Sequence, residues 1–184
     1  PSPLQMDVNS NAADAGVSIK IIGLTTGYVE AEEVVALDAT GISTTSTPFF
    51  RINTVITIAG NATNNITVGQ GSTTYAQIDS GRGRNQAAVY TTPADCAFYL
   101  YRIDAFTADG SQQKAGKFRN FVVLSNGVEL RVAGVSFFNN MNIKRDFPFK
   151  YGEKTDIQLQ MATFSGTHPV GVFGEGILVQ QIMN

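Results

Sequence analysis

The amino-acid sequence predicts an all-β protein, folded as an antiparallel, jelly-roll-like β-sandwich. Turn-forming residues recur at intervals of roughly 8–12 residues, a spacing typical of sandwiches and barrels. The segments between the turns are rich in β-branched and aromatic side chains that alternate with polar ones, as in strands with one buried face. Reactive side chains are scarce, because the 184 residues include one His, one Cys and no Trp against 18 Gly.

The domain organisation expected from the sequence is simple. Residues 1–16 are predicted to form an N-terminal arm or a first strand, and residues 17–184 a single β-sandwich domain. A chain of this length fits one domain or two small ones, and it contains no linker, charge block, low-complexity tract or clear repeat. Residues 17–24 alternate Ile19 and Ile21 with polar neighbours, which predicts the first strand of the domain.

Two segments in the first third of the chain are predicted to be strands on different grounds. Residues 28–37 contain good helix formers, but the segment is short, lies between turn signals and ends in consecutive valines. Residues 50–58 alternate strictly, with Ile52 and Ile56 on one face and Val55 among polar side chains on the other. Such alternation predicts a strand with one buried and one exposed face.

The second half of the chain contains the clearest hairpin. An Asn-Gly pair at 126–127, which tolerates the positive φ angles of a tight turn, lies between strand-like segments at 118–124 and 128–135. Residues 155–161 alternate Ile, Leu and Met with polar side chains, and residues 176–182 predict a last, apolar strand. The whole chain then holds about a dozen strands, enough for a two-layer antiparallel sandwich.

Composition and charge argue against nucleic-acid and membrane partners. The formal net charge is −2, whereas phosphate binding needs a concentrated basic face. No apolar run approaches the ~18 residues of a membrane helix, and no signal-peptide pattern is visible at the start of the chain. Charged residues make up only 15%, so copies repel one another little; we expect a homo-oligomer with cyclic, threefold symmetry as the working hypothesis.

No residue is predicted to be catalytic, to bind a cofactor or to ligate a metal. His168 lies in a predicted loop without partners at metal-ligand spacing, and Cys96 most simply acts as a small apolar side chain. Alternation along residues 28–37 would place Glu30 and Glu32 about 6.6 Å apart, a separation that suits glycosidase carboxylates. An exposed edge strand with alternating acids is the preferred interpretation.

Six side chains are candidates for an interface with other subunits. They are Phe137, Phe138, Phe147, Phe149, Arg82 and Arg84. The four phenylalanines pack in the core or an interface or, in a glycan-binding module, form an exposed aromatic cluster. The two arginines lie in a glycine-containing loop that either docks an acidic partner, since guanidinium groups offer several planar donors, or is an ordinary solvated hairpin tip.

Seven short stretches, spread over most of the chain, share strand-and-turn motifs with one protein family. They are residues 4–14 (LQMDVNSNAAD), 17–24 (VSIKIIGL), 32–37 (EEVVAL), 50–55 (FRINTV), 81–94, 153–157 (EKTDI) and 174–179 (GEGILV). In this order they resemble the small virion proteins of tailed bacteriophages. The chain departs from that pattern at Thr25, where Asp is usual, and at residues 95–96, where Asp and Cys replace a polar pair.

The resemblance implies a non-enzymatic structural protein located in the virion, with copies of itself and a major capsid or tail protein as partners. Capsid decoration, or cement, or a head fibre is the first expectation, and a tail, neck or fibre accessory protein is the alternative. A β-sandwich module that binds a host-surface glycan is a second class, and an enzyme that depends on Glu30 or Glu32 is a third. The resemblance carries no catalytic residue to this chain.

Overall fold

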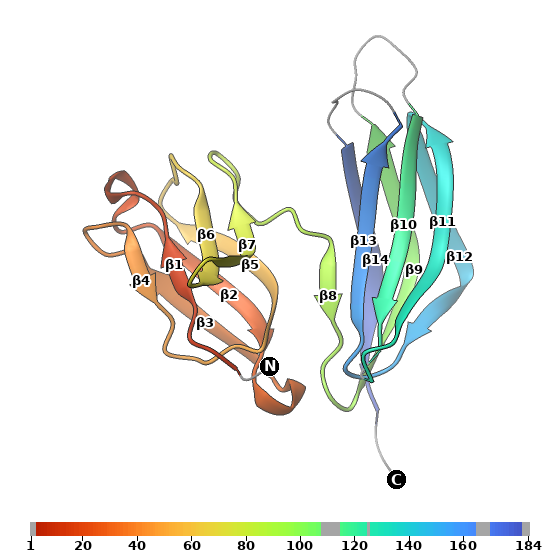
Figure 1. Cartoon of the computed structure of the whole chain (residues 1–184), viewed down its shortest axis with the longest axis horizontal. Helices are drawn as coiled ribbons and strands as arrows, with labels where there is room; N and C mark the ends of the chain where they lie inside the picture. Colours follow the sequence, from red (N-terminus) through yellow and green to blue (C-terminus); the bar gives the residue numbers. More distant parts are fainter. Residues whose placement is uncertain (1–2, 108–114, 125, 165–169, 182–184) are drawn as a thin grey trace. The chain divides into compact units, whose positions relative to one another are not determined.

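The computed structural model describes residues 3–107, 115–124, 126–164 and 170–181 (Figure 1). This part of the chain holds fourteen strands, all paired antiparallel, and two short 3₁₀ helices at Ala12–Asp14 and Thr26–Tyr28. The prediction of an all-β, sandwich-like protein is therefore confirmed. Within the described residues, no helix has the length and hydropathy needed to cross a membrane.

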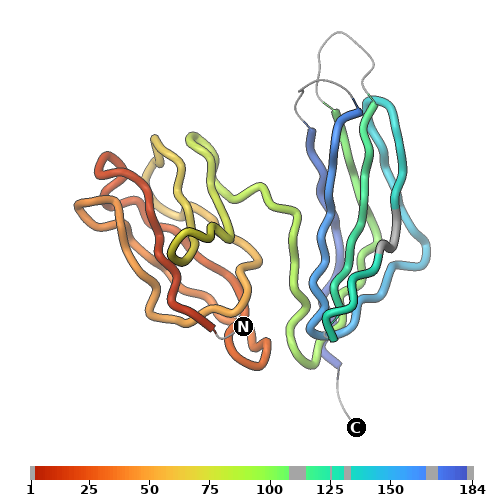
Figure 2. Tube along the Cα trace, in the orientation of Figure 1, coloured from red at the N-terminus to blue at the C-terminus, as the bar shows by residue number. Residues whose placement is uncertain are grey.

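The chain divides into two compact units, Pro1–Ala87 and Ala88–Asn184. Each unit has two antiparallel sheets and its own cluster of buried apolar side chains. This division differs from the single domain expected over residues 17–184. The sequence shows no linker there because a new strand begins at Val89, immediately after the division. Figure 2 follows the chain through one unit and then the other.

Unit 1 contains the first seven strands. They are β1 (Asp7–Asn9), β2 (Ser18–Leu24), β3 (Glu30–Ala36), β4 (Ile42–Thr44), β5 (Arg51–Ala59), β6 (Ile66–Gln70) and β7 (Thr73–Ile78). One sheet has the order β4-β1-β6-β7 and the other β3-β2-β5. Residues 7–9 thus form a first strand inside a sheet, which is one of the two forms expected for residues 1–16, and the predicted strand at 28–37 is β3.

The core of unit 1 lies between these sheets and includes Ile19 and Ile21 of β2 and Val55 of β5, all without exposed surface. β5 alternates as predicted, but the face with the isoleucines is not the buried one. Val55 on the opposite face is buried, while Ile58 is 50% exposed. The side chain of Asn85 accepts a hydrogen bond from the Val55 backbone N–H at 2.9 Å. Because that amide satisfies a backbone group, the buried face of β5 tolerates a polar neighbour.

Unit 2 contains the remaining seven strands. They are β8 (Val89–Thr91), β9 (Cys96–Thr107), β10 (Ala115–Val123), β11 (Glu129–Phe138), β12 (Asn140–Tyr151), β13 (Asp156–Thr163) and β14 (Val170–Gln180). One sheet has the order β11-β10-β13-β8 and the other β12-β9-β14. Figure 1 shows the two layers, with β10, β11 and β13 in front of β9, β12 and β14.

The predicted hairpin at 126–127 is confirmed between β10 and β11. Gly127 adopts a φ of 80°, and its N–H donates to the Leu124 carbonyl at 2.8 Å. The Asn126 side chain accepts from the Val128 N–H at 3.0 Å. β10 leads into this turn, and its inward-facing side chains, among them Phe118, lie in the core of unit 2.

Candidate interaction surface

The exposed apolar side chains are concentrated in unit 2. Among the described residues, 17 large apolar side chains are exposed, and 12 of these belong to unit 2. Those of unit 2 are Val89, Phe106, Val128, Leu130, Val135, Phe138, Phe147, Phe164, Val170, Phe173, Ile177 and Val179. An excess of exposed apolar side chains on one unit makes that unit the candidate for an interaction surface.

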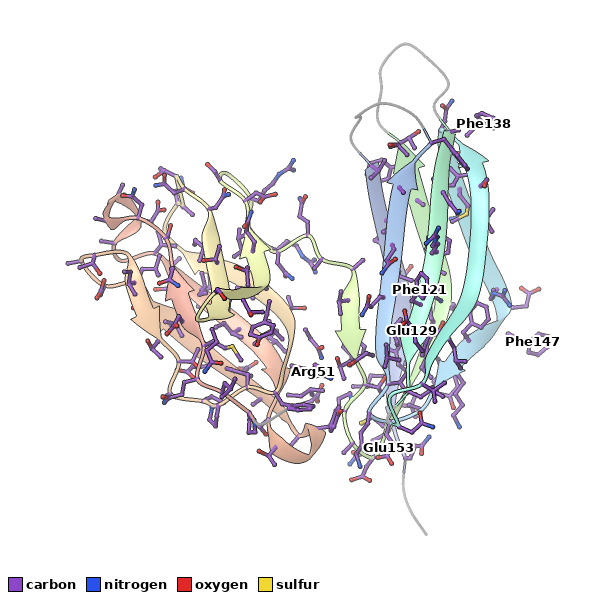
Figure 3. All side chains as sticks on the ribbon, in the orientation of Figure 1. Arg51, Phe121, Glu129, Phe138, Phe147 and Glu153 are labelled. Carbon is purple, nitrogen blue, oxygen red and sulfur yellow. The ribbon has the colours of Figure 1, made fainter. Side chains whose placement is uncertain are left out.

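The most exposed of these side chains lies on a bulge of β12. Lys144 pairs with Arg102 and Phe149 pairs with Leu100, so residues 145–148 lie opposite one residue of β9. Bulges of this kind re-aim side chains and interrupt a strand edge. Phe147 lies within the bulge, is 87% exposed and points away from the sheet (Figure 3). We call residues 145–148 the β12 bulge.

The other predicted aromatic interface residues divide between surface and core. Phe138, at the end of β11, is 68% exposed and also points outward (Figure 3). Phe137 is buried in the core of unit 2, which is one of the alternatives expected for these rings. Phe149 is half-buried against the same core, and the guanidinium of Arg145 lies 3.7 Å from the centre of its ring. Phe137 is buried and Phe138 exposed because neighbouring residues along a strand face opposite sides of the sheet.

The loop of Arg82 and Arg84 is held against β5 as an extra strand-like segment. The Thr57 N–H donates to the Gly83 carbonyl at 2.9 Å, and Arg84 forms an isolated antiparallel bridge with Ile56. Both arginines are exposed. This backbone pairing covers part of the edge of β5, which is a more defined role than that of a solvated hairpin tip.

A row of polar side chains crosses the outer face of the sheet β12-β9-β14. Asp104 of β9 accepts a hydrogen bond from the Asn142 amide of β12 and pairs with Arg102 at 2.7 Å. Arg102 also lies 3.8 Å from the carboxylate of Glu175 on β14. Glu175 accepts a hydrogen bond from the phenol of Tyr101, which together with burial raises the pKa of that phenol. These cross-strand contacts hold β14 to β9 at the centre of the sheet.

The last strand, β14, lies at one end of that sheet and presents an apolar edge. Phe173, Ile177 and Val179 are exposed on it, and Glu175 is its only ionisable residue. A Cβ at Gly171 would lie 2.4 Å from the ring of Phe106. Gly171, and likewise Gly176 beside Phe98, therefore make room for aromatic rings of β9, as expected where another group approaches the backbone closely. We call β14 with its exposed side chains the β14 edge.

Two of the residues considered for catalysis, Glu30 and Glu32, lie on β3. Glu32 is paired with Lys20 at 2.5 Å, and Glu30 is exposed near the start of β3. Glu33 accepts hydrogen bonds from the N–H groups of Ser46 and Thr47 at 2.8 and 2.7 Å. His168 lies outside the described residues. Within the residues described, no group of three or more His, Cys, Asp and Glu side chains is placed to hold a metal ion.

No protein-family model, curated protein or solved structure matches the chain. Two features of the surface escaped the sequence argument: the β14 edge and the polar row that crosses to it. The glycines at 171, 174 and 176 obscured the apolar alternation of β14, and residues of the polar row are neighbours only after β9, β12 and β14 pair.

Proposed function

We propose that this chain is a non-enzymatic structural protein of a tailed-bacteriophage virion that works through subunit interfaces. Capsid decoration, or a head fibre, is the first assignment. The observation that carries the proposal is the concentration of exposed apolar side chains on unit 2, with Phe147 and Phe138 the most exposed of them. A monomer with such a surface gains free energy by burying it against another protein, at about 25 cal/mol per Å² of apolar area.

The resemblance of the ordered strand-and-turn motifs to small virion proteins supports the same assignment. So does the low share of charged residues, because repeated subunits can then approach without strong repulsion. We extend the proposal to a jelly-roll-like arrangement of unit 2. Its early strands pair with its last ones, β8 with β13 and β9 with β14, and such non-local pairing is a requirement of that topology.

A tail, neck or fibre accessory position is the alternative within the virion. A second class, a module that binds a host-surface glycan, is favoured by the exposure of Phe138 and Phe147 on the β11–β12 side of unit 2. Aromatic rings presented in this way can stack on sugar rings. Binding of purified chain to a glycan array would favour this class over a shell-bound role.

The experiment that tests the proposal uses virions of the phage that encodes this chain. Mass spectrometry of gradient-purified particles should detect the chain, and a particle reconstruction should show it bound to the head. Particles assembled with the Phe147→Ser variant should carry fewer copies. The matched control is Val34→Ser, which removes an exposed apolar side chain from β3 of unit 1. Absence of the chain from purified virions would contradict the proposal.

A further inference from the structure

The two sheets of unit 2 are unequal, and the shorter one ends at β14. The sheets face each other strand by strand, β13 against β14, β10 against β9 and β11 against β12. The remaining strand, β8, lies on the far side of β13 and therefore extends past β14. A further strand on the outer side of β14 would continue the three-stranded sheet and lie opposite β8.

The backbone of β14 is arranged to accept such a strand. The Gln181 N–H donates to the Asp95 carbonyl at 2.7 Å, continuing the pairing of β14 with β9. Backbone groups alternate sides along a strand, so the odd-numbered residues of β14 bond to β9. The even-numbered ones, including Gly176 and Leu178, direct their N–H and C=O groups to the outer side. No strand pairs with them in the described part of the chain.

The other two long edges of unit 2 carry features that discourage strand addition. The edge of β12 is interrupted by the β12 bulge, which contains a proline and two charged residues. The edge of β11 has its own register shift and carries Glu129. Bulges, proline and charges are the usual means by which proteins block edge pairing. The β14 edge has no proline and no inserted residue of its own, because the register shift between Glu175 and Gly176 comes from the extra residue Tyr101 on β9.

The side chains of the β14 edge suit a partner of the same composition. Phe173, Ile177 and Val179 face outward and are exposed. Glu175 is the one ionisable side chain of the strand, and it lies 3.8 Å from the guanidinium of Arg102, which also pairs with Asp104. Each edge therefore brings a single carboxylate to the contact, and a register that keeps the two Glu175 side chains apart limits their repulsion. An 11-residue strand spans roughly 37 Å at 3.4 Å per residue, long enough for extensive backbone pairing.

We propose that a second copy of this chain adds its β14 antiparallel to the β14 of the first, about a twofold axis at Gly176. This register places Phe173 opposite Val179 and Glu175 opposite Ile177, with outward residues on a common face. An axis at Glu175 would instead oppose two carboxylates. The choice of a second copy rests on the proposed function, because a virion component is present in many identical copies. The result is a dimer with an isologous interface, in place of the threefold assembly expected from the sequence.

The first test is the mass of the full chain by size-exclusion chromatography with light scattering, from 1 to 200 μM. We expect twice the chain mass of 19.7 kDa at the upper end. Ile177→Lys should raise the dissociation constant at least tenfold. The matched control is Val34→Lys, since Val34 and Ile177 are each 57% exposed but Val34 lies in unit 1. Thermal melting followed by circular dichroism checks that both variants fold.

The second test reads the register. In a Cys96→Ser background, the single variants Phe173→Cys and Val179→Cys are mixed and oxidised. Directly opposed residues have Cα atoms within disulfide range, so the mixture should form a disulfide-linked dimer faster than either variant alone.

Three results would overturn the inference: a monomer at all concentrations, a threefold mass, or a dimer that Ile177→Lys leaves intact. None of these removes the chain from the virion. Conversely, absence from purified virions would remove the proposed function even if the dimer formed in solution.

Discussion

The amide nitrogen of Asn120 donates a hydrogen bond of 2.7 Å to the hydroxyl oxygen of Tyr151 inside the core of unit 2. Asn120 lies on β10 of one sheet and Tyr151 ends β12 of the other, so the bond joins the two layers. Burial raises the pKa of the Tyr151 phenol, although the hydrogen bond from Asn120 works in the opposite direction. The phenol is therefore neutral at ordinary pH, and the pair is a polar link in an otherwise apolar core.

We expect Tyr151→Phe to destabilise unit 2 by about 1–3 kcal/mol, because the buried Asn120 amide loses its partner. Asn120→Leu should cost less, because it leaves the phenol unpaired but also removes the Asn120 Oδ1, a buried oxygen with no hydrogen-bond partner in the described part of the chain. The double variant should cost less than the sum of the two, because it removes both polar groups. Urea unfolding of the four proteins gives the coupling free energy, and strict additivity would contradict the assignment.

A second prediction concerns the acid sensitivity of unit 1. Asp14 is buried and accepts hydrogen bonds from the Ser10 hydroxyl at 2.6 Å and from the Thr63 N–H at 2.7 Å. These bonds hold the pKa of its carboxyl far below the usual range. The folded state therefore binds this proton more weakly than the unfolded chain. The stabilisation is complete above about pH 5 and is lost progressively as the pH falls further.

Melting temperatures of unit 1 should fall between pH 5 and pH 2.5, and Asp14→Asn should flatten that dependence while lowering the melting temperature at pH 7. Asp7→Asn, at the first residue of β1, is the control for the loss of one carboxylate, and the fall in acid should persist in it because Asp14 is retained. Glu33 adds to the same trend: burial raises the pKa of its carboxyl, but the bonds from Ser46 and Thr47 outweigh this and lower it. A pH-independent wild-type melting temperature would contradict the prediction.

Because each unit has its own core, substitutions should act on one unit at a time. Phe49 and Phe118 have no exposed surface and lie in the cores of units 1 and 2, respectively. Each change to Ala should cost about 3–5 kcal/mol. Differential scanning calorimetry should show one of two transitions shifted by each variant. A single transition that moves equally in both would mean that the units unfold together.

Two glycines with positive φ allow a steric effect to be separated from backbone strain. Gly41 has a φ of 78°, and a Cβ there would lie 2.2 Å from the Asn11 carbonyl oxygen. Gly71 has a φ of 56°, and its Cβ would meet nothing within 4 Å. Gly71→Ala should therefore cost only the ~1–2 kcal/mol of the left-handed conformation, and Gly41→Ala clearly more. Chemical denaturation measures the loss in unfolding free energy of each variant. Equal losses would show that the backbone at Asn11 moves away from the new Cβ without further cost.

The strands could be predicted from the sequence because their signals are local. Alternation located β2, and the Asn-Gly pair located the β10–β11 hairpin. Alternation alone does not say which face is buried when both contain apolar residues. On β5, Val55 is buried and Ile58 is exposed because the Asn85 segment and the irregular pairing with β2 set the face.

The division into two units and the candidate surface depend on contacts between distant residues. Phe137 and Phe138 are indistinguishable in the sequence, yet pairing opposite Gly116 turns the first ring inward and pairing opposite Ala115 turns the second outward. The polar row needs Arg102, Asp104 and Glu175 to meet across strands that are about 70 residues apart in the chain. Such partners follow only from the register.

Two phenylalanines at the β12 bulge, Phe147 and Phe149, are expected to have different roles, one in binding and one in stability. Phe147 is exposed, so Phe147→Ser should change stability by less than about 0.5 kcal/mol, yet reduce the number of copies bound to the virion. Phe149 packs against the core beneath Arg145, so Phe149→Ala should cost about 2–4 kcal/mol. Chemical denaturation and quantitative mass spectrometry of particles measure the two effects separately. If Phe147→Ser left particle occupancy unchanged, the most exposed apolar side chain of unit 2 would have no part in binding.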